Sequence, residues 1–198
     1  MTLRIELKYK LLLMKKGIVI VLAFGLFLGC SSATKVPQNA ETVAAFTSFV
    51  EQKTFQFRAN TAYPMTTQAF NSVANSGILP PGSASGAIQS IGISSFIKVY
   101  GDSVSGKLPF YGERQFGGGL TSNAGIEFKG IPKTYSQTYN EAKNRYDIAF
   151  EIADKMERHQ VNITLFPNMS ANVSVNSNQR DTIRYVGTVA AIESDKKE

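Results

Sequence analysis

The only histidine in the sequence is the first residue to test for acid–base chemistry. His159 stands beside Arg158 at the end of a predicted strand, and a general base needs a positioned nucleophile and a group that orients it. Serines are abundant, but residues 82–86 read Gly-Ser-Ala-Ser-Gly, which has the wrong centre for the G-x-S-x-G nucleophile motif. We therefore expect His159 to be an ordinary surface residue, and we assign no catalytic residue.

Cofactor and metal chemistry also lack a recognisable motif. Gly101 and the glycines at 117–119 stand in no P-loop or dinucleotide-binding pattern, so they are more typical of turns. Asp147, Glu151 and Asp154 form acidic pairs on predicted solvent-facing positions of a strand, and no D-x-D-x-D-G calcium loop occurs. The sequence therefore predicts neither a cofactor nor a metal ligand.

The N-terminal residues read as an export signal. Two lysines precede an apolar run of 12 residues, 17–28, which ends just before Cys30. A charged start, a short apolar run and a small residue before the cleavage point are typical of a secretory signal, whereas a transmembrane helix needs roughly 20 apolar residues. We predict a signal peptide over residues 1–29. Because Met14 also opens a typical signal, translation from Met14 is a second hypothesis.

Cys30 is the only cysteine, and its setting predicts a chemical role. The four residues before it, Leu-Phe-Leu-Gly, resemble a bacterial lipobox, in which the thiol receives a diacylglyceryl group. Several acyl chains, each contributing ~0.8 kcal/mol per buried CH₂, attach a protein stably to a membrane. We predict palmitate-type lipidation of Cys30, a lipidated tether over residues 30–39, and a domain in the periplasm or at the cell surface of a bacterium, with the outer membrane favoured. The alternative is an ordinary signal with an incidental cysteine.

Most of the excess positive charge belongs to this signal. Five of the 21 basic residues and one of the 15 acidic residues precede Cys30, so the remaining residues carry a net charge of only +2. Their basic side chains are scattered and form no patch for phosphate contacts, so we expect no nucleic-acid partner.

The elements that would position a site begin after the tether. Apolar residues at three- and four-residue spacing after Asn39 predict one amphipathic helix. Alternation then predicts a strand that ends near Pro64, and the glycines, prolines and serines of residues 71–90 predict a long loop. Residues 96–100 and 103–108 follow as a predicted hairpin.

Regular alternation is clearest in the last third of the chain. Apolar and polar residues alternate in the segments 145–152, 161–165, 171–176 and 183–189, which gives each strand one buried and one solvent-facing side. Short turn sequences join them, so consecutive strands should be neighbours in an antiparallel meander. We predict a mainly β fold with one domain over residues 40–192: an antiparallel sheet, sandwich-like or a partly open barrel, with one N-terminal amphipathic helix. Residues 193–198 form a charged tail.

Most aromatic residues fall on the inward positions of these predicted strands. Phe55, Phe57, Tyr146, Phe150 and Tyr185 are examples, and their positions favour packing in the core over stacking on a sugar. The chain has no tryptophan, which further weakens a sugar-stacking hypothesis.

Four segments carry a resemblance to a known family. They are residues 57–64 (FRANTAYP), 108–114 (LPFYGER), 125–128 (GIEF) and 177–187 (SNQRDTIRYVG). With these segments the chain resembles the domain of unknown function 4251 family, small lipoproteins of Bacteroidetes-type bacteria, over roughly residues 41–191. The resemblance implies a β-rich lipoprotein of the periplasm or outer membrane and supplies no catalytic residue.

Two functional hypotheses follow, beside a purely structural role such as a spacer, which would need neither a pocket nor a partner surface. The first is a membrane-tethered envelope binding or assembly module without catalytic activity, with the membrane and an envelope protein or glycan as partners. The second is an envelope hydrolase or glycan-binding protein that uses the loops 71–90 and 110–123. For either, the densest part of the resemblance suggests a candidate binding surface at Leu108, Phe110, Tyr111 and Arg114.

Overall fold

The alternating segments of the sequence form the strands of a single sheet. The computed structural model describes residues 40–79, 81–83, 86–89, 94–114, 125–154 and 157–192, all of which belong to the compact unit Gln38–Glu198. The strands are β1 (Thr54–Tyr63), β2 (Ile88–Gln89), β3 (Phe96–Tyr100), β4 (Ser103–Leu108), β5 (Ile126–Gly130), β6 (Thr134–Asn140), β7 (Arg145–Asp154), β8 (Glu157–Leu165), β9 (Ser170–Ser177) and β10 (Ile183–Ala191). The helices are α2 (Ala40–Glu51), α3 (Gln68–Asn75) and the short 3-10 helix η2 (Glu141–Lys143).

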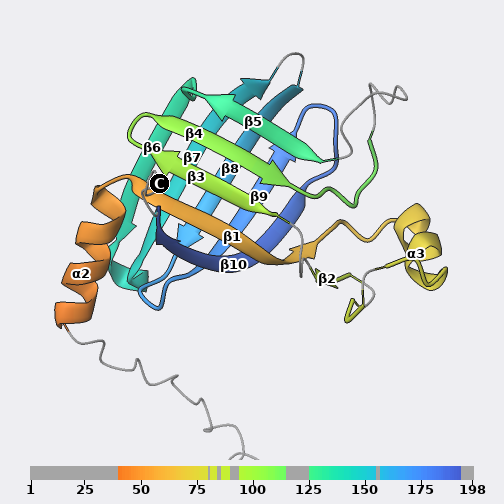
Figure 1. Ribbon diagram of the computed structural model, residues 1–198, viewed down its shortest axis with the longest axis horizontal. Helices are drawn as coiled ribbons and strands as arrows, with labels where there is room; N and C mark the ends of the chain where they lie inside the picture. Colours follow the sequence, from red (N-terminus) through yellow and green to blue (C-terminus); the bar gives the residue numbers. More distant parts are fainter. Residues whose placement is uncertain are drawn as a thin grey trace, which may run out of the picture. The chain divides into compact units, whose positions relative to one another are not determined.

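All the strand pairs in this sheet are antiparallel (Figure 1). Within the described residues the order is β5-β4-β3-β1-β10-β9-β8-β7-β6, and the two-residue β2 pairs with β1. The strands from β6 to β10 follow one another as a meander, as do β3 to β5, and β1 joins the two groups by pairing with β3 and β10. This arrangement confirms the predicted mainly β, antiparallel fold.

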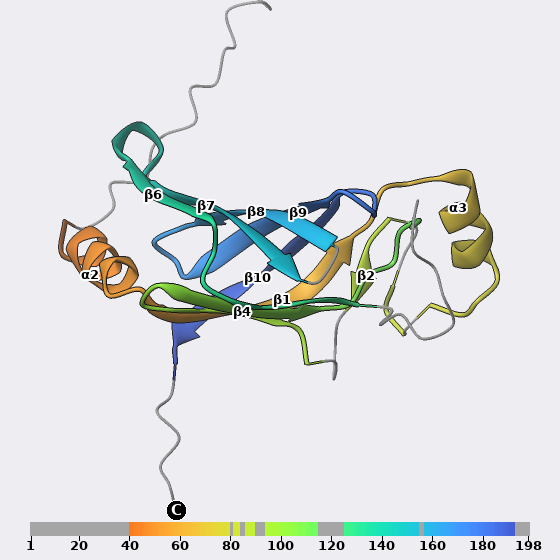
Figure 2. The same cartoon turned by 90° about the horizontal axis from the view of Figure 1, so that it is seen from above.

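The sheet curls into a half-barrel, so that its two groups of strands face each other across a core (Figure 2). Phe128 of β5 meets Phe150 of β7 edge to face, with ring centroids 5.9 Å apart. The five aromatic residues predicted to face inward are all buried, none being more than 4% exposed. Because β5 and β6 remain edge strands in this order, the barrel is open on one side.

Helix α2 covers one end of the half-barrel. Phe46 and Val50 are buried on its inner face, and the Phe46 ring meets the Tyr146 ring at 5.7 Å between centroids. The side-chain amide of Gln137 also donates to the Val50 carbonyl at 3.4 Å, which links α2 to the edge strand β6. The predicted N-terminal helix is therefore confirmed, and it ends at Glu51, just before Lys53 adopts a left-handed conformation (φ 49°).

The prediction of a long loop over residues 71–90 is wrong in part. Helix α3 occupies its start and β2 its end. The Thr67 hydroxyl accepts a hydrogen bond from the Phe70 backbone N–H at 3.1 Å, an N-terminal cap, and Phe70 is only 6% exposed. The helix has only eight residues, fewer than the window over which helical periodicity can be recognised from a sequence.

Strand β6 is an addition to the predicted meander. Its inward positions hold Tyr135, Gln137 and Tyr139, which are half-buried, instead of branched aliphatic residues. Each of these side chains has a polar end that forms a hydrogen bond, such as Tyr135 to Gln137 at 2.8 Å. A strand whose inner face is amphipathic shows little hydropathy alternation, which explains why the pattern of the sequence stops at residue 145.

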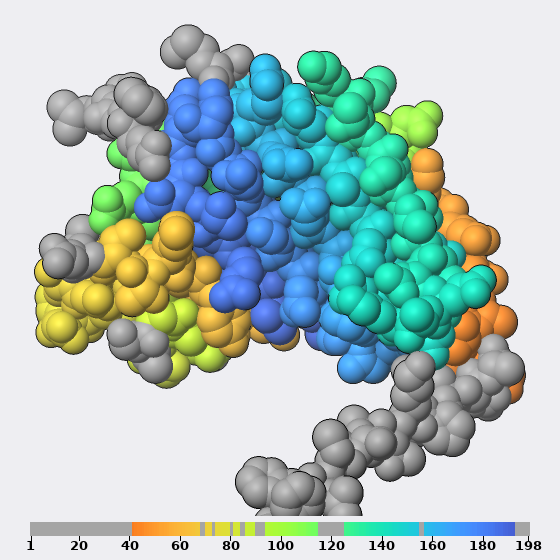
Figure 3. Space-filling model, turned by 180° about the vertical axis from the view of Figure 1, so that it is seen from behind, coloured from red at the N-terminus to blue at the C-terminus, as the bar shows by residue number. Residues whose placement is uncertain are grey.

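The convex face of β7 to β10 points away from the core (Figure 3). Its outward residues in β8 and β9 are almost all amides and hydroxyls, for example Asn162, Thr164, Asn172 and Ser174. This face therefore differs in composition from the usual solvent-facing side of a sheet, where Lys and Glu are common.

Candidate functional site

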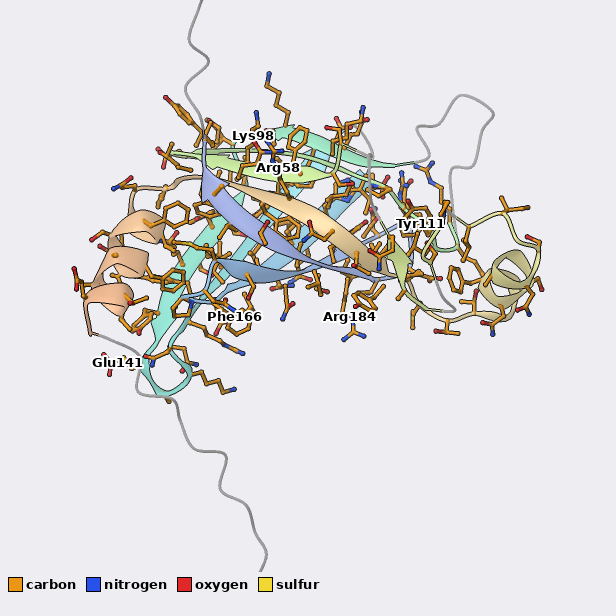
Figure 4. All side chains as sticks on the ribbon, turned by 60° about the horizontal axis from the view of Figure 1, so that its bottom comes forward. Arg58, Lys98, Tyr111, Glu141, Phe166 and Arg184 are labelled. Atoms are coloured by element: carbon orange, nitrogen blue, oxygen red, sulfur yellow. The ribbon has the colours of Figure 1, made fainter. Side chains whose placement is uncertain are left out.

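The segment predicted as a binding surface runs from the end of β4 across the end of the sheet that lies opposite α2, where Figure 4 labels Tyr111. Leu108 is in the core at 1% exposure, and Phe110, Tyr111 and Arg114 are half-buried. The Tyr185 hydroxyl donates to the Pro109 carbonyl at 2.6 Å. The segment is thus held against β10 by its backbone, and its role in binding a ligand stays a prediction.

A buried carboxylate lies beneath this segment. Glu157 is 9% exposed and accepts four hydrogen bonds. Arg180 donates from Nε and Nη2 at 2.7 and 3.1 Å, Arg114 from Nη2 at 3.2 Å, and the Ser177 hydroxyl at 2.7 Å. We call Glu157, Ser177, Arg180 and Arg114 the Glu157 cluster. It connects β8, β9, the β9–β10 turn and the segment after β4.

The Glu157 cluster favours the ionised carboxylate. Burial by itself raises the pKa of Glu157, but the hydrogen bonds from Arg180 and Ser177 and the charge of Arg180 outweigh burial and hold the pKa below its ordinary value. The Arg180 guanidinium also lies over the Phe110 ring, 5.1 Å from its centroid. Since four donors already occupy the two carboxylate oxygens, the geometry suits a structural connection better than proton transfer to a ligand.

The expectation that His159 is an ordinary surface residue is wrong. His159 is 1% exposed, its ring lies 5.8 Å from that of Phe128, and its Nδ1 lies 3.8 Å from Glu157 Oε1. Burial lowers its pKa, although the negative charge of Glu157 acts in the opposite direction. The residue has the same parity in β8 as Val161 and Ile163, so the alternation that buries those two also buries His159.

A groove of about 340 Å³ lies on the outer face of β8, β9 and β10, beside the end of β1. This is the face shown in Figure 3. Its described lining consists of Tyr63, Asn162, Thr164, Asn172, Val173, Ser174, Arg184, Tyr185 and Val186. Neither His159 nor the Glu157 cluster lines this groove, because both face the interior of the half-barrel.

A β-bulge aims Tyr63 at the groove. The register between β1 and β10 shifts between Ala59 and Thr61, so that Ala62 faces the core and Tyr63, the partner of Arg184, faces outward. Without the shift, alternation from Phe55 would turn Tyr63 inward. Gly187 lies opposite the bulge, where a Cβ atom would overlap the Arg58 carbonyl oxygen.

The polar side chains of the groove stand in a regular array. Asn162 is paired across strands with Ser174, and Thr164 with Asn172. Arg184 continues the first row, as the partner of Ser174 on β10, and Figure 4 shows it directed away from the sheet. Among the described residues, the side chains of Asn162, Asn172, Ser174 and Arg184 have no protein partner. The groove therefore presents uncommitted donors and acceptors on paired strands.

Comparison with known proteins identifies the family of this chain. The sequence model of the family described as Domain of unknown function (DUF4251) matches residues 37–189. The chain belongs to this family. A crystal structure of a DUF4251 family protein from Bacteroides eggerthii DSM 20697 is similar in fold, with a TM-score of 0.52 at 14% sequence identity, covering 77% of this chain and 89% of that chain. No curated protein matches.

In this DUF4251 chain, sequence reasoning missed Tyr63 and Arg184 as site residues. The alternation in the sequence identified Asn162, Thr164, Asn172 and Ser174 only as solvent-facing residues of their strands. The signal that could have drawn attention to the face was its composition, since adjacent strands expose amides and hydroxyls in place of charged side chains. Tyr63 could not be found in this way, because the bulge that turns it outward has no signature in the hydropathy pattern.

Several predictions on the DUF4251 chain concern residues outside the described part. Cys30, the signal peptide and the tether lie there, as do residues 115–123 of the candidate loop 110–123. In the part that the structure describes, no group of three or more His, Cys, Asp or Glu residues could hold a metal ion. No described helix is both long enough and apolar enough to cross a membrane.

Proposed function

We propose that the protein is a lipid-anchored module of a bacterial cell envelope that binds a ligand in the groove on the outer face of β8 to β10. The observation that carries this proposal is the set of uncommitted polar side chains in a hollow of about 340 Å³. The strands that carry them are paired on both sides, which fixes the backbone positions from which these side chains project.

The lining favours binding over catalysis. General acid–base chemistry uses a carboxylate or imidazole within reach of the substrate, and the described lining contributes Arg184 and two tyrosines as its titratable groups. Glu157, the described carboxylate whose pKa is lowered, lies on the opposite face of the sheet. Its oxygens already accept hydrogen bonds from two arginines. The groove can therefore hold and orient a ligand, and it offers no pair of groups for proton transfer among its described residues.

The anchor in this proposal is Cys30, and residues 30–39 are the tether. A stretch of ten residues reaches at most roughly 35 Å when fully extended, so the domain would stay close to the membrane surface. Of the two functional hypotheses from the sequence, the groove supports the binding module. The hydrolase reading depends on loop residues that the structure only partly describes.

The anchor is tested by metabolic labelling with an alkyne analogue of palmitate in a bacterial host. The native chain should incorporate label and sediment with membranes, and Cys30→Ser should do neither. A Ser31→Ala variant is the matched control and should behave as the native chain. Label that persists in Cys30→Ser, or an unlabelled native chain, contradicts the lipid anchor.

Binding is tested by titrating the isotope-labelled full chain in detergent micelles with a soluble digest of bacterial cell envelope. Amide resonances of residues that line the groove should shift, with those of Asn162, Asn172 and Arg184 among them. Shifts confined to Phe110, Tyr111 and Arg114 would move the site to the segment that follows β4. If no amide resonance of a described residue shifts, the binding function is contradicted.

A further inference from the structure

We infer that the ligand of the groove is a carbohydrate that carries an acidic group, with that group placed beside Arg184. The inference rests on the proposed function of the groove as a binding site and names the chemical class of its ligand.

The hydrogen-bonding groups match those of sugar hydroxyls. Asn162 and Asn172 each offer a carbonyl acceptor and an NH₂ donor, and the Ser174 hydroxyl both donates and accepts. A sugar hydroxyl likewise donates and accepts, so neighbouring hydroxyls can form paired bonds with an amide. Because these side chains have no partner among the described residues, a ligand would not have to break protein contacts to reach them.

The spacing of these groups suits a pyranose ring. Directly opposed residues, such as Asn162 and Ser174, lie about 5 Å apart at Cβ. Residues two apart on one strand, such as Asn172 and Ser174, lie about 7 Å apart. The side chains of Asn162, Thr164, Asn172 and Ser174 thus mark the corners of an area close to that of one sugar ring with its hydroxyl groups.

Two lining residues supply apolar surface at the side of this array. Tyr63 is 36% exposed and Val186 is 39% exposed. The C–H faces of a sugar ring pack against aromatic and branched side chains, while its hydroxyls point sideways. The groove is open and exposes more apolar than polar surface beside its amides and hydroxyls, which fits a flat ring with C–H faces and hydroxyls better than a wholly apolar ligand, which needs a largely enclosing pocket.

The acidic group follows from the charge of the groove. Arg184 is the one described lining residue with a full charge at neutral pH, and no described carboxylate pairs with it. Asp147, which neighbours Thr164, accepts hydrogen bonds from Thr164 Oγ1 and Arg145 Nε at 3.1 Å each. The free guanidinium at one end of the array is therefore suited to a carboxylate of the ligand.

An extended peptide is a poorer fit to the same groove. Peptides commonly bind sheets by adding a strand at an edge with free backbone groups. The groove lies over β8, β9 and β10, each of which is paired on both sides. Recognition there must use side chains, as it does for sugars.

The test measures binding of matched saccharides to the full chain in detergent micelles by isothermal titration calorimetry. The pairs are 3′-sialyllactose with lactose, and trigalacturonate with galactotriose. At least one acidic member should bind more tightly than its neutral partner. Arg184→Gln should reduce its affinity at least about tenfold and leave the neutral partner nearly unchanged. Arg184→Lys should retain part of the preference for the acidic saccharide. The double variant Asn162→Ala with Asn172→Ala should weaken the binding of both the acidic and the neutral saccharide.

Arg58→Gln is the control for nonspecific charge, because Arg58 is exposed on the outer side of β1 and does not line the groove. If Arg58→Gln and Arg184→Gln lose the same affinity for the acidic saccharide, the placement of the acidic group beside Arg184 is overturned. If neither acidic saccharide binds while an envelope digest still shifts the groove resonances, the carbohydrate inference fails and the binding function stands. If the digest also has no effect, both fail. Unchanged thermal unfolding midpoints establish that the variants are folded.

Discussion

Glu157 shows at the scale of one residue how a buried charge is retained in a small β domain. Its four hydrogen bonds come from Arg114, Ser177 and Arg180, and each of these residues stands in a different segment from Glu157 itself. Removing one partner of such a group leaves the others buried without compensation.

Glu157→Gln should therefore lower the free energy of unfolding by about 3 kcal/mol, because two guanidinium groups would lose their counter-charge. Urea denaturation at pH 7 measures the change. The matched control is Glu151→Gln, whose partner Arg158 is well exposed and lies 3.4 Å away. It should cost less than about 1 kcal/mol. Equal losses in the two variants would contradict the special role of the Glu157 cluster.

His159 predicts a dependence of stability on pH. Its folded-state pKa is lowered by burial from an ordinary value of 6.5, so the unfolded chain takes up a proton before the folded chain does. The contribution of His159 to stability is therefore complete above pH 6.5 and is lost as the pH falls from 6.5 toward the lowered pKa.

The measurement is the free energy of unfolding from pH 7.5 to 5.0 in the native chain and in His159→Gln. The native chain should lose up to about 1.4 kcal/mol per pH unit from this residue, and the variant should show a flatter curve over that range. Glu157, with a pKa lowered from 4.5, contributes in the same direction only at more acidic pH. Parallel curves would contradict the burial of a neutral imidazole.

At the scale of elements, the bulge in β1 determines which residues reach the groove. Gly187→Ala would place a Cβ atom against the Arg58 carbonyl oxygen and within 2.9 Å of the Phe57 ring. We expect a loss of about 2–3 kcal/mol, measured by urea denaturation, because backbone cannot move aside as a flexible side chain can. Thr188→Ala, at the next and outward-facing position of β10, is the control and should change stability by less than about 0.5 kcal/mol.

Helix α2 stabilises the sheet through its buried side chains. Phe46→Ala would remove a fully buried ring that packs on Tyr146, and we expect a loss of about 3–5 kcal/mol in urea denaturation. Ser48→Ala, on the exposed side of the same helix, should have little effect. A small loss for Phe46→Ala would mean that α2 only rests on the sheet and does not close its end.

At the scale of the whole half-barrel, the order of the strands predicts a gradient of local stability. The amides of β1, β10 and β9 lie in the middle of the sheet and should exchange with deuterium most slowly. Those of the edge strands β5 and β6 should exchange faster, as should the short helix α3, in which Phe70 is the one buried residue among those whose side chains the structure describes. Hydrogen exchange followed by mass spectrometry measures this order, and fastest exchange in β10 would contradict the topology.

The parts of the fold that could be predicted are the segments in which every second residue is buried. The hairpin of β3 and β4 and the meander from β7 to β10 lie where alternation places them. Strand β6 could not be predicted in this way, because the inward side chains of Tyr135 and Gln137 are polar at their ends and only partly buried. His159 shows the opposite error: its polarity suggests the surface, while its position in β8 requires the interior.

The sequence by itself determined the antiparallel strands, the aromatic core and the N-terminal helix, because each depends on the spacing of neighbouring residues. Only the tertiary structure decided which outward faces form a groove and which polar residues meet in the interior. Those outcomes depend on the pairing of β1 with β10, on the bulge that turns Tyr63 outward and on the curl that brings β5 against β7. Such contacts join residues distant in the chain, so no local pattern encodes them.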